Sequence, residues 1–268
     1  MTDQNTTTDQ EKNFSSRPVP PPVVEKDDFP EELWEQASPA GNETKKEEER
    51  HPVPEYLKSV YGRRYFRALF TKLFDDEWMA AVGGFFCGRR LIKAVLREID
   101  EGKDVLQLGI ASGDFERKIV QKMNSKGLYC IEDISPCHID VAKPRVSAWL
   151  NAEFKERDFT VPDELRYDVV IGYFVLHEMP DPRKRAVLKR AVNALKPDGK
   201  MIFVDYARPK KFHPLKYPVK MFNRLYEPFA ESLWFNDIRE FAPKTDDLVW
   251  ERQTFFGDMY QCVIARKH

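Results

Sequence analysis

The chain has 268 residues, of which 42% are hydrophobic and 13% aromatic, enough for one sizeable α/β domain with a smaller appendage. The formal net charge of −1 is unevenly distributed, because residues 1–54 carry a net −7 and residues 55–268 carry about +6. The sequence shows no run of 18 apolar residues, no signal peptide and no Arg-rich transit peptide, so we expect a protein that is soluble or peripherally membrane-bound.

The first two predicted segments precede the main domain. Residues 1–54 hold 8 of the 19 prolines and 13 acidic residues with almost no apolar periodicity, which predicts a disordered acidic tail. Residues 55–100 follow a helical pattern with interruptions at Gly83–Gly84 and Gly88, so we expect a cap of two or three helices.

Residues 101–268 read as alternating strands and helices. Continuous apolar strands such as Val169 to Ile171 predict an α/β, Rossmann-like fold with a mostly parallel sheet. The expected strands are 104–109, 127–132, 153–157, 168–174 and 200–205, and the expected helices are 114–124, 136–149, 182–195 and one near 221–241. Gly257 and Asp258 separate two β-rich runs, 247–255 and 258–265, and predict a C-terminal antiparallel hairpin.

The four cysteines, Cys87, Cys130, Cys137 and Cys262, show no metal-binding spacing. We interpret them as reduced, mostly structural thiols.

The first strand ends in a turn of small residues that opens a helix. Gly109, Ala111 and Gly113 form this turn, which lets backbone N–H groups approach a nucleotide-like ligand. The segment resembles the first motif of class I S-adenosylmethionine (SAM) methyltransferases, with two departures. Gln107 stands where an acidic residue is expected, and Ala111 replaces the middle glycine. Taken alone, such a motif could also be an ordinary turn between a strand and a helix that binds no ligand.

Acidic residues also follow the next two strands. Asp133 ends the second strand, where a carboxylate can accept two hydrogen bonds from a ribose diol, and the resemblance assigns it this role in preference to Glu132. The alternative is that Asp133 only caps the helix that begins near Pro136. Asp158 and Phe159 follow the third strand, where the resemblance places the adenine contacts.

The loop after the fourth strand contains His177 and Glu178, which we expect to face the sulfonium end of SAM. Either residue could act as a general acid or base, or help to hold a divalent metal. The alternative is a simple polar loop, since a lone histidine is more often structural than catalytic. The spacing does not match a zinc protease motif.

The C-terminal third carries a more specific resemblance. The segments Phe203–Pro209, His213–Lys216, Leu225–Trp234 and Phe255–Gln261 resemble the rhodoquinone biosynthesis methyltransferase-like family, a relative of the ubiquinone and menaquinone methyltransferases, over about residues 60–265. The resemblance implies conversion of ubiquinone to rhodoquinone, in which an amino group from SAM replaces a ring methoxy group. It also implies manganese, for which His177, Glu178, Asp181, Asp205 and His213 are candidate ligands that the sequence does not choose among.

Gln107 gives this resemblance a chemical interpretation. A carboxylate at this position would keep the methionine ammonium of SAM protonated, and a neutral amide would let it deprotonate and attack the quinone. The alternative is that Gln107 only hydrogen-bonds the same amine through its carbonyl oxygen.

Residues 55–73 and 207–224 interleave basic and aromatic side chains, which favours contact with an anionic membrane, although a cap core with a charged rim gives the same pattern. Binding to nucleic acid is disfavoured by the pI of 6.6. We therefore expect a cytoplasmic protein at the inner membrane, mitochondrial if the source is eukaryotic. Two alternatives to amino transfer stay open: a conventional methyltransferase, and a non-catalytic SAM-fold protein in a quinone-biosynthesis assembly.

Overall fold

The computed structural model describes residues 85–111, 114–124, 126–162 and 164–268. The predicted acidic tail, most of the predicted helical cap and the turn residue Gly113 lie outside these ranges. The described strands form one seven-stranded sheet in the order β3-β2-β1-β4-β5-β7-β6. Their bounds are Val105–Leu108 (β1), Tyr129–Asp133 (β2), Ala152–Glu156 (β3), Tyr167–Tyr173 (β4), Leu195–Tyr206 (β5), Leu248–Phe255 (β6) and Tyr260–Lys267 (β7).

The sheet confirms the predicted α/β class. β1 to β5 pair in parallel, and β7 pairs antiparallel with both β5 and β6, which is the expected C-terminal hairpin. The strand order reverses between β1 and β4, so the connections that leave their adjacent carboxyl ends run in opposite directions, and open α/β sheets bind ligands at such a position.

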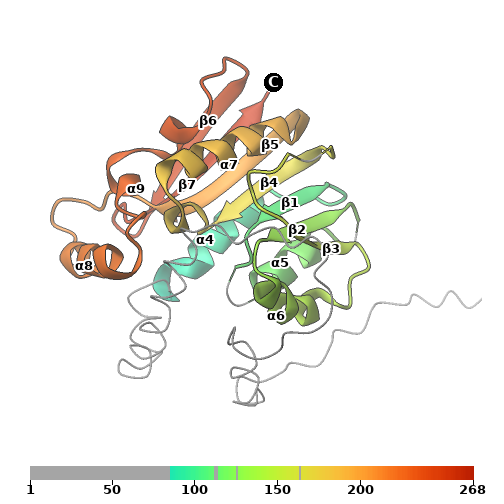
Figure 1. Cartoon of the computed structure of the whole chain (residues 1–268), viewed down its shortest axis with the longest axis horizontal. Helices are drawn as coiled ribbons and strands as arrows, with labels where there is room; N and C mark the ends of the chain where they lie inside the picture. Colours follow the sequence, from blue (N-terminus) through green and yellow to red (C-terminus); the bar gives the residue numbers. More distant parts are fainter. Residues whose placement is uncertain (1–84, 112–113, 125, 163) are drawn as a thin grey trace, which may run out of the picture. The chain divides into compact units, whose positions relative to one another are not determined.

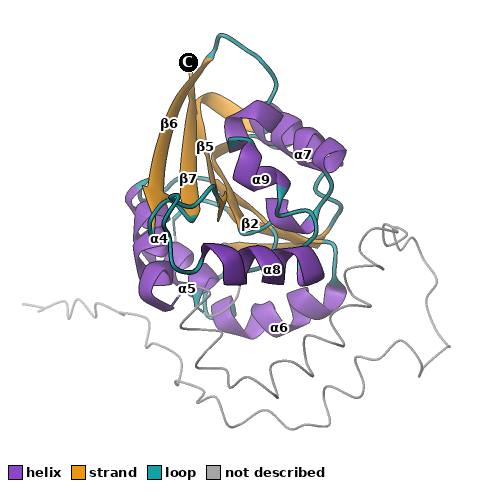
Figure 2. Cartoon of the chain, turned by 90° about the vertical axis from the view of Figure 1, so that its left-hand side faces the viewer, coloured by secondary structure: helices purple, strands orange, loops and turns teal. Residues whose placement is uncertain are grey.

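Helices cover both faces of the sheet (Figures 1 and 2). The helices of the described residues are α4 (Phe85–Arg97), α5 (Phe115–Lys122), α6 (Pro136–Val146), α7 (Asp181–Asn193), α8 (Lys216–Tyr226) and α9 (Ser232–Phe235), with short 3₁₀ helices η1 (Leu176–Glu178) and η2 (Ile238–Phe241). Figure 1 shows α8 at the end of the sheet to which the arrowheads of β4 and β5 point.

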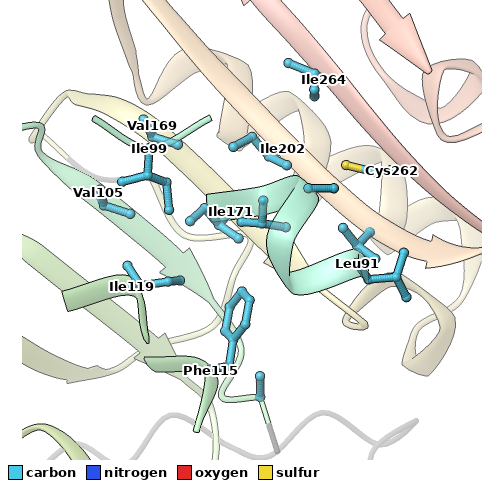
Figure 3. Close-up of a cluster of buried hydrophobic side chains, with 14 of the residues drawn as sticks. Leu91, Ile99, Val105, Phe115, Ile119, Val169, Ile171, Ile202, Cys262 and Ile264 are labelled. Carbon is cyan, nitrogen blue, oxygen red and sulfur yellow. The ribbon is translucent and has the colours of Figure 1, made fainter. Parts of the chain in front are cut away.

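Two apolar clusters lie on the two sides of the sheet. One joins the inner faces of α4 and α5 to alternate residues of the strands, among them Leu91, Ile119 and Ile171 (Figure 3). The other joins α7, η1 and η2 to the opposite strand residues, including Val170 and Phe203. Because strand side chains alternate between faces, continuous apolar strands supply both clusters, as a sheet covered on both sides requires.

Three local expectations need correction. Gly88 does not interrupt a helix but lies within α4, where nothing occupies the space next to its Cα. The single helix expected near 221–241 is three short helices, α8, α9 and η2. Pro228, two residues beyond the end of α8, cannot continue a helix, which explains the break. β5 begins at Leu195 rather than Lys200, and a register shift opposite Tyr167 and Val169 accommodates the expected turn around Gly199.

Candidate functional site

A pocket opens beyond the carboxyl ends of β1, β2 and β4. Residues from four predicted positions line it, namely Gly109, Asp133, Asp158 with Phe159, and Glu178. These side chains are far apart in the sequence and meet because parallel strands end at one edge of the sheet. Five of the predicted site residues therefore gather around one cavity, and Tyr173, Phe174 and Arg183 are among its other lining residues. The predicted residues Gln107, Ala111 and His177 do not line it.

The turn after β1 is joined to the end of β2 by Asp133. The backbone N–H of Ile110 donates to Asp133 Oδ2 at 2.9 Å, and the N–H of Ser135 donates to Asp133 Oδ1 at 2.8 Å. Gly109 has φ +80°, and a Cβ there would lie 3.2 Å from Val175, so glycine meets both the backbone and the space requirement. Asp133 Oδ1 also lies 3.3 Å from Nδ1 of His138, so the carboxylate contacts both the backbone ahead of α6 and this imidazole at the pocket. The acceptor capacity that remains on it could serve a ribose diol.

Glu132 is excluded from the ribose role by its surroundings. Its carboxylate is fully buried and accepts a bidentate pair of hydrogen bonds from Arg190, at 2.6 and 2.9 Å. The structure thus separates the two adjacent acids, with Glu132 in the core and Asp133 at the pocket.

Asp158 and Phe159 both line the pocket, but Asp158 already has a cationic partner. Arg183, from the first turn of α7, makes a bidentate ion pair with its carboxylate. Burial alone would raise the pKa of Asp158, but the hydrogen bonds from Thr160 and Arg183 outweigh it and lower the pKa below its ordinary value. The carboxylate is therefore held ionised and fixed in orientation at the wall of the pocket.

Gln107 lies beneath the turn rather than at the pocket wall. It is fully buried, and its Nε2 donates to the carbonyl of Gly109 at 2.8 Å and to Glu116 Oε1 at 3.0 Å. Its Oε1 accepts a hydrogen bond from the Tyr129 hydroxyl. Glu116 also accepts the backbone N–H of Ala111 at 2.7 Å. The carboxylate missing at position 107 is thus present nine residues later, on α5, where it fixes the same turn.

His177 and Glu178 occupy different environments. Glu178 lines the pocket, whereas His177 is 7% exposed, with Nδ1 3.1 Å from Asp205 Oδ1 and Nε2 3.8 Å from Glu227 Oε1. Burial disfavours the charged imidazole, but Asp205 and Glu227 outweigh it and raise the pKa of His177 to about 10. His177 is therefore a cation at neutral pH and cannot serve there as a general base.

The described residues do not fit a manganese site. They contain no group of three or more His, Cys, Asp or Glu side chains arranged to hold a metal ion. Asp205 accepts the backbone N–H groups of Leu176 and His177 with Oδ2, so its oxygens are already committed. Asp181 pairs with Lys184 at 2.8 Å, and His213 packs against the Phe256 ring. Four of the five candidate ligands, all except Glu178, are thus in contact with other protein groups.

Sequence reasoning missed three participants: Arg183, Glu116 and Glu227. Arg183 and Glu116 lie on helices and Glu227 directly follows one, and each reaches the site through tertiary packing, so no strand-end signal marks it. A helix-face pattern offers one weak signal, since Glu116 falls in the first turn of α5, where acids are favoured.

Comparisons with known proteins agree with this geometry. Residues 106–201 match the family described as "Methyltransferase domain". An uncharacterized methyltransferase, GK2543, of Geobacillus kaustophilus (strain HTA426) is 23% identical over 181 residues, 68% of this chain and 74% of that protein.

Solved structures support the same fold. N-methyltransferase NodS from Bradyrhizobium japonicum WM9, in complex with S-adenosyl-L-homocysteine (SAH), gives a TM-score of 0.51 at 15% identity, covering 80% of this chain and 99% of NodS. The mitomycin 7-O-methyltransferase MmcR gives 0.56 at 18% identity, covering 80% of this chain but only 61% of MmcR. The chain therefore has the Rossmann-like fold of class I SAM-dependent methyltransferases, with a methyltransferase-domain match at its centre.

Proposed function

We propose that this protein is a SAM-dependent transferase that converts ubiquinone to rhodoquinone, replacing one ring methoxy group with an amino group derived from SAM. The proposal that the protein binds SAM is supported by the pocket, in which Gly109, Asp133 and Phe159 meet beyond the ends of β1, β2 and β3. The amino-transfer part is supported by the resemblance of the C-terminal segments, Phe203–Pro209 and Leu225–Trp234 among them, to the rhodoquinone biosynthesis methyltransferase-like family.

The residues of the pocket fit SAM by their chemistry. Asp133 can accept the ribose hydroxyls, Phe159 can stack on the adenine, and Gly109 leaves room for the chain of the ligand to pass close to the backbone. SAM supplies an activated methyl group and, in amino transfer, the amine nitrogen. The protein positions it and excludes water.

Substrate access is part of the proposal. The segment around α8 exposes Phe212, Tyr217 and Met221, which are 89%, 74% and 66% exposed, among basic side chains that include Lys216 and Lys220. Such a face suits an anionic bilayer, where a quinone with an isoprenoid tail resides. Among the described helices, none is sufficiently long and apolar to span a membrane.

Conventional methylation of a quinone or another small molecule is the second candidate, favoured by the "Methyltransferase domain" match over residues 106–201. Mass spectrometry decides between the two. The purified protein is incubated with ubiquinone and with SAM labelled separately in its amine nitrogen and its methyl carbon. Nitrogen label in a product that has lost a methoxy group supports amino transfer, and carbon label supports methylation. Folded protein that binds no SAM contradicts both.

A further inference from the structure

Three carboxylate side chains are among the described residues that line the pocket, and two of them have partners within the protein. Asp133 accepts two backbone N–H groups, and Asp158 makes an ion pair with Arg183. The third, Glu178, is half-buried. Within the described part of the chain, no group forms a hydrogen bond or an ion pair with its carboxylate, so this acceptor faces the pocket without a protein partner.

The charges around Glu178 do not compensate it. Glu178 interacts electrostatically with the imidazolium of its neighbour His177. That one cation already faces two other carboxylates, since its Nδ1 lies 3.1 Å from Asp205 Oδ1 and its Nε2 lies 3.8 Å from Glu227 Oε1. The wall of the pocket that follows β4 therefore carries a surplus of negative charge, which favours a cationic group on the ligand.

The strand order places Glu178 beside the sulfur of SAM. Asp133 ends β2 and Phe159 follows β3, so an adenosine bound to them lies over that half of the sheet. The sulfur is attached to C5′ of the ribose, and the ligand continues from there towards β1 and its neighbour β4. Glu178 follows β4, and Tyr173 and Phe174 at the end of the same strand also line the pocket. The order β3-β2-β1-β4 thus brings the sulfonium towards one carboxylate and two aromatic rings.

We propose that Glu178 recognises the positive charge of the sulfonium and thereby distinguishes SAM from SAH, its neutral thioether. The two ligands differ by one methyl group and by the charge on sulfur. A half-buried carboxylate attracts that charge more strongly than a carboxylate in bulk water does, and the rings of Tyr173 and Phe174 add cation–π attraction. This inference rests on the proposed function, but only on the SAM binding that amino transfer and methylation share. In either reaction, the selectivity keeps SAH from competing with SAM for the pocket.

The test measures by calorimetry how the full chain binds SAM, SAH and sinefungin, a SAM analogue in which a carbon bearing a protonated amine replaces the methylated sulfur. E178Q removes the charge with almost no change in side-chain shape. It should bind SAM and sinefungin more weakly than wild type by about fivefold or more, and SAH within about twofold of wild type. E178D keeps the carboxylate and should retain most of the affinity for both cationic ligands.

E153Q is the matched control. Glu153 is exposed on β3 and does not line the pocket, so removing the same charge there should leave all three affinities unchanged. Five results would each overturn the role of Glu178: unchanged SAM binding in E178Q, equal weakening of SAM and SAH, an E178Q chain that does not fold, an E178D chain as weak as E178Q, or the same loss in E153Q. Folded wild type that binds neither SAM nor SAH would instead overturn the proposed function, and this inference with it.

Discussion

The amide of Gln107 allows a quantitative test of the polar network beneath the glycine turn. In Q107E a carboxylate takes the place of the group whose Nε2 lies 3.0 Å from Glu116 Oε1, and both side chains are fully buried. Two carboxylates this close in a buried site cannot both ionise, so the pair retains a proton.

The cost follows from that proton. Protonating a glutamate with an unfolded-state pKa of about 4.3 at pH 7 costs about 3.7 kcal/mol, at about 1.36 kcal/mol per pH unit. The proton can satisfy Glu116 or the carbonyl of Gly109 but not both, so the 2.8 Å hydrogen bond to Gly109 is lost for about 1 kcal/mol more. We expect Q107E to lower the free energy of unfolding by about 4–5 kcal/mol at pH 7.

The pH dependence has a definite sign. Above about pH 4.3 the folded variant binds one proton more than the unfolded chain, so its stability relative to wild type falls by about 1.36 kcal/mol for each unit that the pH rises. Urea unfolding followed by tryptophan fluorescence between pH 5 and 8 measures this slope. If Q107E had the same free energy of unfolding as wild type and the same dependence of it on pH, the reasoning would be refuted.

The double variant Q107E/E116Q supplies the control. It again places one amide opposite one carboxylate, so it should regain most of the lost stability and the pH dependence of wild type. The same protein also tests the chemistry, because it carries a carboxylate at position 107 without the folding defect. If the neutral residue promotes amino transfer, this variant should bind SAM and aminate poorly, and unchanged amination would contradict that role.

Three further predictions concern the core and the site. Asp205 and Glu227 outweigh burial and raise the pKa of His177 to about 10, so this contribution to stability is complete below about pH 6.5 and is lost as the pH rises towards 10. H177Q should flatten the decline in unfolding free energy over that range, and an unchanged slope in urea titrations would argue against it. R190M removes the bidentate partner of the buried Glu132 carboxylate and should lower the free energy of urea unfolding by about 3–5 kcal/mol. A decrease below about 1 kcal/mol would mean that Arg157, whose Nη1 lies 3.5 Å from Glu132 Oε1, is enough to compensate the buried charge. G172A places a methyl group against the Phe203 ring and should lower stability by about 1–3 kcal/mol, which a thermal melt equal to wild type would contradict.

The sequence predicts the sheet and the strand-end residues well because both depend on local patterns. Apolar runs such as Val169 to Ile171 predict parallel strands, and parallel strands place Gly109 and Asp133 at one edge. The orientation of Gln107 could not be predicted in this way, since it depends on Glu116 and Tyr129, which approach it only after α5 and β2 have packed.

Partners on helices were harder to predict than residues on strands. Arg183 holds Asp158, and Glu227 faces His177, through helix packing that has no period-2 or glycine signal. The end of α8 near residue 226 could be predicted from Pro228. The burial of Asn223 could not, because it looks like an ordinary surface residue of an amphipathic helix.

Phe174 connects the pocket to the surroundings of His177. It has φ +55°, a left-handed conformation that costs a non-glycine residue about 1–3 kcal/mol, and its N–H donates to the carbonyl of Val204 at 2.8 Å. Immediately after this turn, the backbone N–H groups of Leu176 and His177 donate to Asp205, while Phe174 itself lines the pocket. The strained residue thus sets both the pocket wall and the position of His177 beside Glu227. Since strain persists only where the surrounding structure enforces it, the turn at Phe174 holds the pocket wall and His177 in a fixed relation.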